Sequence, residues 1–264
     1  MIMMSFISFS HLASVRKTSA TRISVREFWS RRKKPPPPPQ FSIVSPQLVT
    51  PQLESSSVPA HVSPPSYHQT GDPGPGPTRP EVKTPESIQC MRESCALARR
   101  ILTQALTIST PGTTTQQIDD LVTQLSFDAG AYPSPLNYRG FPKSVCTSVN
   151  NVACHGIPDN RALIDGDIVN VDVTVYLNGH HGDCSETVLV GDQDPGGSSR
   201  RLLEVGRGAL QAGIDQCGPG QQFCGVGGAV QKYVRDEGFN IIPAFTGHGI
   251  GSYFHGPPDI YCCR

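Results

Sequence analysis

The chain has 264 residues, of which 26 are glycine and 25 are proline, and hydrophobic residues make up 37% of the total. This length allows one large domain or two small ones, and the high share of glycine and proline indicates that part of the chain lies outside a packed core. No stretch approaches the roughly 18 consecutive apolar residues of a transmembrane helix, so the sequence excludes such a span.

The formal net charge of zero conceals a separation of charge along the chain. Residues 1–34 contain eight basic residues and one acidic residue, whereas the rest of the chain contains 14 basic and 21 acidic residues. A basic head on an acidic body argues against a nucleic-acid-binding domain. The head is rich in arginine, serine and threonine, which is typical of an organellar transit peptide. We predict a transit peptide over residues 1–34, directed to the mitochondrion rather than the chloroplast; a disordered basic tail is the alternative.

Proline dominates the next segment, because residues 35–80 hold 14 of the 25 prolines. Proline lacks a backbone donor and has a fixed φ angle, so this segment cannot form regular hydrogen-bonded ladders. We predict that residues 35–85 form a linker or an extended strap on the surface, and that the folded region starts near Thr84.

Helices and antiparallel strands alternate in the folded region. Apolar residues at helical spacing between Ile88 and Leu106 predict a first helix, and a second begins at the Thr113–Thr115 cap and ends before Gly130. The remaining predicted elements are a loosely alternating segment at 142–154, a strand at 168–176, its partner at 184–190, helices at 199–215 and 222–236, and a short strand at 239–242. This mixture predicts the α+β class.

Asn178-Gly179 is the strongest two-residue hairpin signal in the chain. With that turn, Asp183 pairs with Thr174, and Asp172 and Asp183 become diagonal neighbours on one face of the sheet. Such positions lie roughly 7–8 Å apart at the backbone. Two carboxylates there can converge on cations, as a two-metal site requires.

A structural role for these aspartates is the competing interpretation. Aspartate is rare in strands, and burying it without a partner is costly. A salt bridge could satisfy one such residue, but two on one face need more positive charge than the neighbouring sequence supplies. We therefore favour a metal site.

Three histidines lie in settings that suit a binding site. His155 precedes a loop, His248 lies between glycines, and His255 follows seven residues later. Glycines let the backbone approach a ligand, and neutral imidazole is a common ligand of divalent transition metals. Each histidine alone is a weak signal. His180 and His181, beside the hairpin turn, are expected to be solvated.

Four sequence blocks resemble the signature of the methionine aminopeptidase family and occur in the family's order: 141–158, 165–175, 182–187 and 247–255. The first contains Cys-His-Gly-Ile-Pro and the last contains Gly-His-Gly-Ile-Gly. The Ala131–Leu136 segment and the basic presequence are most similar to the mitochondrial type 1 form. The resemblance covers about residues 86–261.

The resemblance implies the pita-bread fold, in which two pseudo-symmetric α+β halves surround a dinuclear metal centre. It implies that Asp172 binds one divalent ion, that Asp183 bridges both ions, and that His248 binds the second. The mixed oxygen and nitrogen ligands leave the choice among cobalt, manganese, iron and zinc open. The implied activity is hydrolytic removal of the initiator methionine from nascent proteins.

The resemblance also implies catalytic and substrate-binding residues. His155 contacts the substrate near its amine and the scissile amide, and His255 bonds to the substrate carbonyl. Both are therefore expected to be catalytic and substrate-binding. The residues at the positions of the family's methionine pocket are Tyr138, Phe141, Cys146 and Phe254. The substrates would be peptides with an N-terminal methionine, and the family is usually monomeric.

The sequence departs from the family pattern after His255. The pattern includes two glutamate ligands and a second long hairpin that the nine residues after His255 do not contain. The resemblance therefore predicts a catalytic domain over residues 86–264 that is truncated at its C-terminus. A non-catalytic truncated form, either a binding protein or an unfolded product, is the alternative to an active aminopeptidase.

Overall fold

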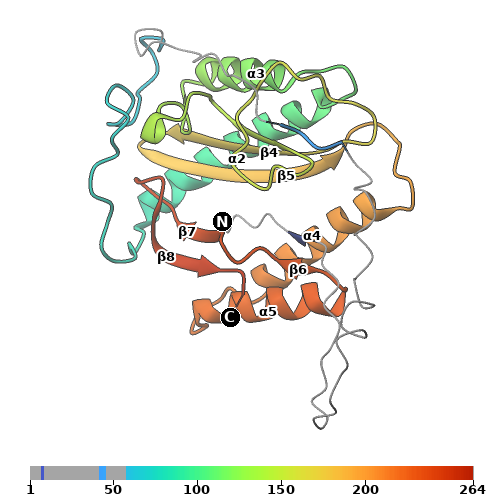
Figure 1. Cartoon of the computed structure of the whole chain (residues 1–264). Helices are drawn as coiled ribbons and strands as arrows, with labels where there is room; N and C mark the ends of the chain where they lie inside the picture. The colour runs from blue at the N-terminus through green and yellow to red at the C-terminus, as the bar shows by residue number, and fades with distance from the viewer. Residues whose placement is uncertain (1–6, 9–41, 46–57, 264) are drawn as a thin grey trace, which may run out of the picture.

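The computed structural model describes residues 7–8, 42–45 and 58–263 (Figure 1). The predicted transit peptide therefore lies outside the described residues, apart from the two residues of β1 (Ile7–Ser8), which pair with β6 (Asn240–Ile241). No helix in the described part of the chain combines the length and the apolar character that a membrane span requires.

Two helices begin the α+β unit, as the apolar spacing predicts. Helix α2 (Pro85–Ile108) starts at Thr84, whose side chain accepts a hydrogen bond from the amide of Ser87. Helix α3 (Thr115–Asp128) starts with a capping box between Thr114 and Gln117. The predicted cap of the second helix is confirmed, and the first helix begins three residues before Ile88, the first apolar residue of its predicted spacing.

The main sheet is antiparallel and is built around one long strand. Strand β4 (Ile168–Leu177) pairs along its length with β5 (His180–Leu189), and its register matches the predicted one. The partner strand begins at His180, four residues earlier than expected. Strands β2 (Tyr132–Pro133) and β3 (Cys146–Val149) pair with β4 as well.

The period-2 alternation of β4 gives the sheet two different faces. The valines from Val169 to Val175 are fully buried and share one core with α2 and α3. On the opposite face, β4 presents Asn170, Asp172, Thr174 and Tyr176. Figure 1 shows α3 on one side of this sheet and the second unit on the other. The apolar face therefore packs against the helices, and the polar face is available to form a site.

The second unit contains α4 (Ser198–Ile214), α5 (Phe223–Asp236), β6, β7 (Thr246–Gly249) and β8 (Gly256–Tyr261). Its core comprises Val205, Ala209, Val226, Val230, Val234, Phe239 and Ile260. The two helices and β6 agree with the sequence prediction to within two residues. The β7–β8 pair was not predicted, since its glycines and prolines carry no strand signal.

Residues 58–83 run along the surface as a strap before α2 (Figure 1). Val62 and Tyr67 are buried in a small core with Phe127 and Leu136. The hydroxyl of Tyr67 donates to the carbonyl of Ser134 at 2.7 Å. Packing thus begins well before the start near Thr84 that the sequence suggests.

Replacing Tyr67 by phenylalanine is expected to destabilise the fold by about 1–2 kcal/mol, because the buried carbonyl of Ser134 loses its donor. Urea denaturation of the full chain measures this change. Tyr261→Phe is the matched control, since the Tyr261 side chain is exposed. Equal stability of the two variants would contradict the role of the strap as a packed element.

A buried polar network fixes the chain before β3 against α3. Lys143 is 2% exposed, and its Nζ atom donates to Oε1 of Gln116 at 2.6 Å. Asp119 is fully buried and accepts a 2.7 Å hydrogen bond from the amide of Ser144. Burial raises the pKa of Asp119 to about 7, although the Ser144 amide and Lys143 act in the opposite direction.

The raised pKa of Asp119 predicts a pH dependence of stability. An unfolded aspartate titrates near pH 4, so the folded state holds this proton more tightly and loses stability as the pH rises from about 4 to about 7. Asp119→Asn removes this loss. The free energy of unfolding of the variant, relative to the parent chain, is expected to rise by roughly 2–4 kcal/mol between pH 4 and pH 8. Denaturant titrations across this range measure it, and a difference that stays constant between pH 4 and pH 8 would contradict the prediction.

Candidate active site

The polar face of the β4–β5 hairpin borders a cavity of about 1040 Å³, and β7 and β8 supply the facing wall. Every site residue that the sequence analysis singles out lines this cavity: Tyr138, Phe141, Cys146, His155, Asp172, Asp183, His248, Phe254 and His255. The fold thus brings residues from four separated sequence blocks to one place.

The two aspartates form the floor of the cavity. Asp172 on β4 and Asp183 on β5 are each 6% exposed and lie on the same face of the hairpin, as the register predicts. Thr174 lies opposite Asp183, and its hydroxyl donates to Oδ1 of Asp183 at 2.8 Å. This bond fixes the orientation of the Asp183 carboxylate. The second oxygen, Oδ2, takes no part in it and lies 3.9 Å from Nε2 of His248.

The carboxylates lie in an environment that disfavours their charge. Burial raises the pKa of both Asp172 and Asp183, and for Asp172 the nearby charge of Asp183 adds to the effect. Within the described part of the chain, Oδ1 of Asp172 is buried and has no hydrogen-bond partner. A buried carboxylate oxygen without a partner is costly, and a bound cation is one way to satisfy it.

His248 on β7 approaches the carboxylates from the opposite wall. Its Nε2 atom is 3.9 Å from Oδ2 of Asp183, and its Nδ1 atom is 3.1 Å from the carbonyl oxygen of Gly249. A proton on Nδ1 that is donated to this carbonyl leaves the Nε2 lone pair facing the carboxylate. A Cβ atom on Gly249 would lie 2.1 Å from the carbonyl oxygen of Pro257, so only glycine allows β7 and β8 to approach this closely.

The other two histidines line the same cavity. His155 has a positive φ of 52° and lies on the loop that follows β3. The ring of His255 stacks on Phe254 at 4.2 Å and lies 4.3 Å from the ring of His248. Burial lowers the pKa of His155, and burial together with His248 lowers that of His255 to about 3. Both rings are neutral near pH 7, so each offers one donor and one acceptor.

Aromatic and apolar side chains form one side of the cavity. Tyr138 packs edge-on against Phe254 with ring centroids 4.8 Å apart. Cys146 on β3 pairs with Asp172 in the sheet, and burial raises the pKa of its thiol, which stays protonated and behaves as a small apolar group. Phe141 also lines the cavity. This wall suits an unbranched apolar side chain.

The expectation that His181 is solvated is wrong, because this residue is only 1% exposed. Its Nδ1 atom is 2.8 Å from the hydroxyl of Ser134, and its ring stacks on Phe254 at 5.2 Å. Alternation along β5 places His181 on the same face as Asp183, which is a signal that the sequence analysis did not use. Thr174 was also missed as a site residue, although the predicted register placed it opposite Asp183.

Carboxylates and histidines that meet in one cleft form a donor set that suits a metal-dependent hydrolase. Residues 89–262 match the family model for metallopeptidase family M24, and the chain belongs to this family.

Within that family, the chain is similar to methionine aminopeptidases. It is 48% identical to methionine aminopeptidase 1D, mitochondrial, of Danio rerio, over 83% of this chain and 64% of that protein. It is 45% identical to methionine aminopeptidase 1D, chloroplastic/mitochondrial, of Arabidopsis thaliana, over 77% of this chain and 57% of that protein. The chain therefore spans less than two thirds of the length of these relatives.

A solved structure confirms the fold. The methionine aminopeptidase of Rickettsia prowazekii superposes with a TM-score of 0.68 and 39% sequence identity, over 70% of this chain and 73% of that one. The chain has the pita-bread fold that the sequence resemblance predicts.

The residues present fit the divalent metal ions that such peptidases use. The donor set combines two buried carboxylates with one imidazole, which is the chemistry that first-row divalent cations accept. Asp172 and His248 line the same cavity, where Oδ1 of Asp172 has no hydrogen-bond partner in the part of the chain that the structure describes and Nε2 of His248 lies 3.9 Å from Oδ2 of Asp183. Among the described residues, no three histidine, cysteine, aspartate or glutamate side chains are positioned so that they could hold a metal ion as they stand, so the fit is one of donor chemistry.

Proposed function

We propose that this protein is a methionine aminopeptidase that removes the N-terminal methionine from newly made polypeptides with the help of two divalent metal ions. The proposal rests chiefly on one observation. A single cavity combines a buried carboxylate oxygen that has no hydrogen-bond partner among the described residues, neutral imidazole rings, and apolar and aromatic side chains. Burying such polar groups is costly unless a ligand uses them.

Asp172, Asp183 and His248 would hold the metal ions, with Asp183 contributing to both. Divalent ions there would supply Lewis-acid polarisation of the scissile carbonyl and would acidify water. Thr174 keeps the Asp183 carboxylate in one orientation through its 2.8 Å hydrogen bond. The two further glutamate ligands that the family resemblance implies belong to a segment C-terminal to His255.

The remaining residues would position the substrate. His155 contacts the amine and scissile-amide end of the peptide, and His255 donates to the carbonyl oxygen that gains negative charge during hydrolysis. Tyr138, Phe141, Cys146 and Phe254 enclose the methionine side chain. A polarizable, flexible thioether packs well against aromatic edges of this kind.

The working location is proposed from the N-terminal composition together with the names of the relatives. The basic, acid-poor head favours an organellar protein, and the Danio rerio relative is named mitochondrial, whereas an Arabidopsis thaliana relative is named both chloroplastic and mitochondrial. We therefore propose the mitochondrion, with the initiator methionine of proteins in that organelle as the target and a monomer as the working form.

Release of methionine by the full chain tests the proposal. A Met-Ala-Ser peptide is incubated with the protein and Mn²⁺ or Co²⁺, and an Ala-Pro-Ser peptide is run in parallel. We expect methionine release and no cleavage before proline. Preference for the proline peptide would contradict the assignment. Release only by a version extended with the family segment that carries the two glutamates would assign the activity to the longer chain.

A further inference from the structure

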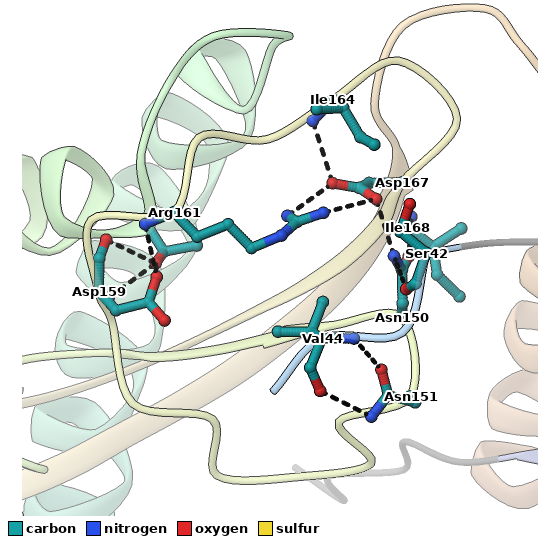
Figure 2. A network of polar contacts seen from close by, with 10 residues as sticks. Ser42, Val44, Asn150, Asn151, Asp159, Arg161, Ile164, Asp167 and Ile168 are labelled. Carbon is teal, nitrogen blue, oxygen red and sulfur yellow. Dashed lines mark hydrogen bonds and ion pairs between the residues drawn. The ribbon is translucent and has the colours of Figure 1, made fainter. Parts of the chain in front are cut away.

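A short segment upstream of the strap lies on the back of the active-site loop. The amide of Val44 donates to Oδ1 of Asn151 at 2.6 Å, and Nδ2 of Asn151 donates to the carbonyl of Val44 at 3.1 Å. Nδ2 of Asn150 donates to the carbonyl of Ser42 at 2.7 Å. Figure 2 shows both asparagines reaching this segment. The Asn151 amide thus pairs with residue 44 as a neighbouring peptide group would in a sheet.

Asn150, one of the two asparagines that receive this segment, is held firmly by the sheet. Asn150 has a positive φ of 52°, its amide donates to the carbonyl of Ile168, and its Oδ1 atom accepts from the Ile168 amide. Asp167 accepts a 2.7 Å bond from Asn150 and a bidentate pair of bonds from Arg161 (Figure 2). Contacts that do not involve residues 42–45 thus hold the Asn150 side of the docking surface in place, which lowers the entropic cost of binding the segment.

One side chain of the segment enters the protein. Val44 is half-buried and packs against the main core, whereas the neighbouring Ile43 is 67% exposed. Val44 and Ser45 border a pocket of about 240 Å³ whose other walls include Val149, Val152 and Ile157. An apolar anchor combined with backbone hydrogen bonds is the usual mode of extended-peptide recognition.

The same pocket touches the rear of the loop that carries Cys154 and His155. Ile157 borders this pocket and also the active-site cavity, so the loop separates the two. Gly156 lies so close to β3 that a Cβ atom there would be 2.1 Å from the carbonyl oxygen of Thr147. Because Ile157 borders both spaces and lies two residues from His155, a displacement of the loop at its rear would also move His155 at the cavity.

We propose that residues 42–45 act as an intramolecular brace, which docks through Val44 and the Asn151 amide and holds the Val152–Ile157 loop in place behind the active site. Ordering four residues is opposed by conformational entropy, so the docking is sensitive to single substitutions. A mature chain that begins before Ser42 retains the brace. A chain that is processed beyond Ser45 loses it.

Hydrogen exchange on the full chain, with Val44→Asp and Ile43→Asp compared, tests the brace. The two variants introduce the same charge at adjacent positions, but only Val44 packs against the core and borders the pocket. In the parent chain we expect the Val44 amide to exchange about tenfold or more slowly than an unstructured peptide. Val44→Asp should remove this protection, and it should also speed exchange several-fold at Val152 and Gly156, whose amides attach the loop to β3 through the Val149 carbonyl and the Ser148 hydroxyl.

Ile43→Asp should leave amide exchange unchanged, both at Val44 and in the loop. Asn151→Ala is a second, milder variant, which should speed amide exchange at the same positions by a smaller factor. Amides of α4 serve as a reference for global unfolding in each sample. The brace is refuted if Val44→Asp leaves the loop protection intact or if the two aspartate variants behave alike. The readout needs no peptidase activity, so failure of the proposed function would leave it standing.

Discussion

Asp183→Asn is expected to remove metal-dependent methionine release while the protein stays folded. Asparagine keeps an oxygen that can accept the Thr174 bond, so the hairpin is preserved. The variant loses the negative charge that would bridge the two ions. Removing a group that merely supports a metal ligand costs roughly 10- to 100-fold in affinity or activity, so loss of a bridging ligand should cost on the order of 100-fold or more.

Metal binding and stability should respond differently to Asp183→Asn. Titration calorimetry with Mn²⁺ should show loss of binding. The metal-free variant should be at least as stable as the parent chain, because one of two adjacent buried carboxylates has been neutralised. Asp259→Asn is the matched control, since Asp259 lines the same cavity but is exposed. Unchanged Mn²⁺ binding by Asp183→Asn would refute the proposed ligand set.

Gly182→Ala is expected to destabilise the fold by about 3 kcal/mol, because its added Cβ atom collides with the backbone of α2. The Cβ atom would lie 2.3 Å from the carbonyl carbon of Ser94 and 2.4 Å from the amide nitrogen of Cys95. Neither atom can move without shifting the helix. Ser94 also ties α2 to the hairpin, since its hydroxyl lies 3.1 Å from the carbonyl of Leu177 and 3.0 Å from that of His180.

A second glycine provides a control of opposite sign. Gly206 lies in the middle of α4, and a Cβ atom there would meet no atom within 4 Å. Gly206→Ala should therefore stabilise the protein by about 0.5–1 kcal/mol, since alanine restricts the unfolded chain and favours helix. Urea denaturation of the metal-free chain measures both variants. A Gly182→Ala chain as stable as the parent would mean that α2 does not contact the hairpin this closely.

Local sequence determined the hairpin that carries the two aspartates. A two-residue Asn-Gly turn allows one register, and that register places Asp172 and Asp183 on one face regardless of the rest of the fold. The helix caps at Thr84 and Thr114 are equally local, because a side chain that bonds three residues ahead acts within one turn. These features could be predicted because every group that decides them lies within a few residues.

Composition alone could not distinguish a linker from a strap. Proline content excludes regular ladders in both cases. The outcome depends on Val62 and Tyr67, which find a core that Phe127 and Leu136 create far away in the chain. The brace at residues 42–45 likewise depends on two asparagine side chains more than a hundred residues away.

The sequence by itself therefore determined the class and the hairpin register, and the family resemblance pointed to residues that meet in one cavity. Only the tertiary structure decided which face of the hairpin meets the cavity. That choice was made when α2 and α3 covered the valine face of β4 and when the glycine-rich β7–β8 pair closed over the polar face. Burial of His181 between Ser134 and Phe254 followed from the same closure. Burial depends on what the rest of the chain places against a residue, and no local pattern contains that information.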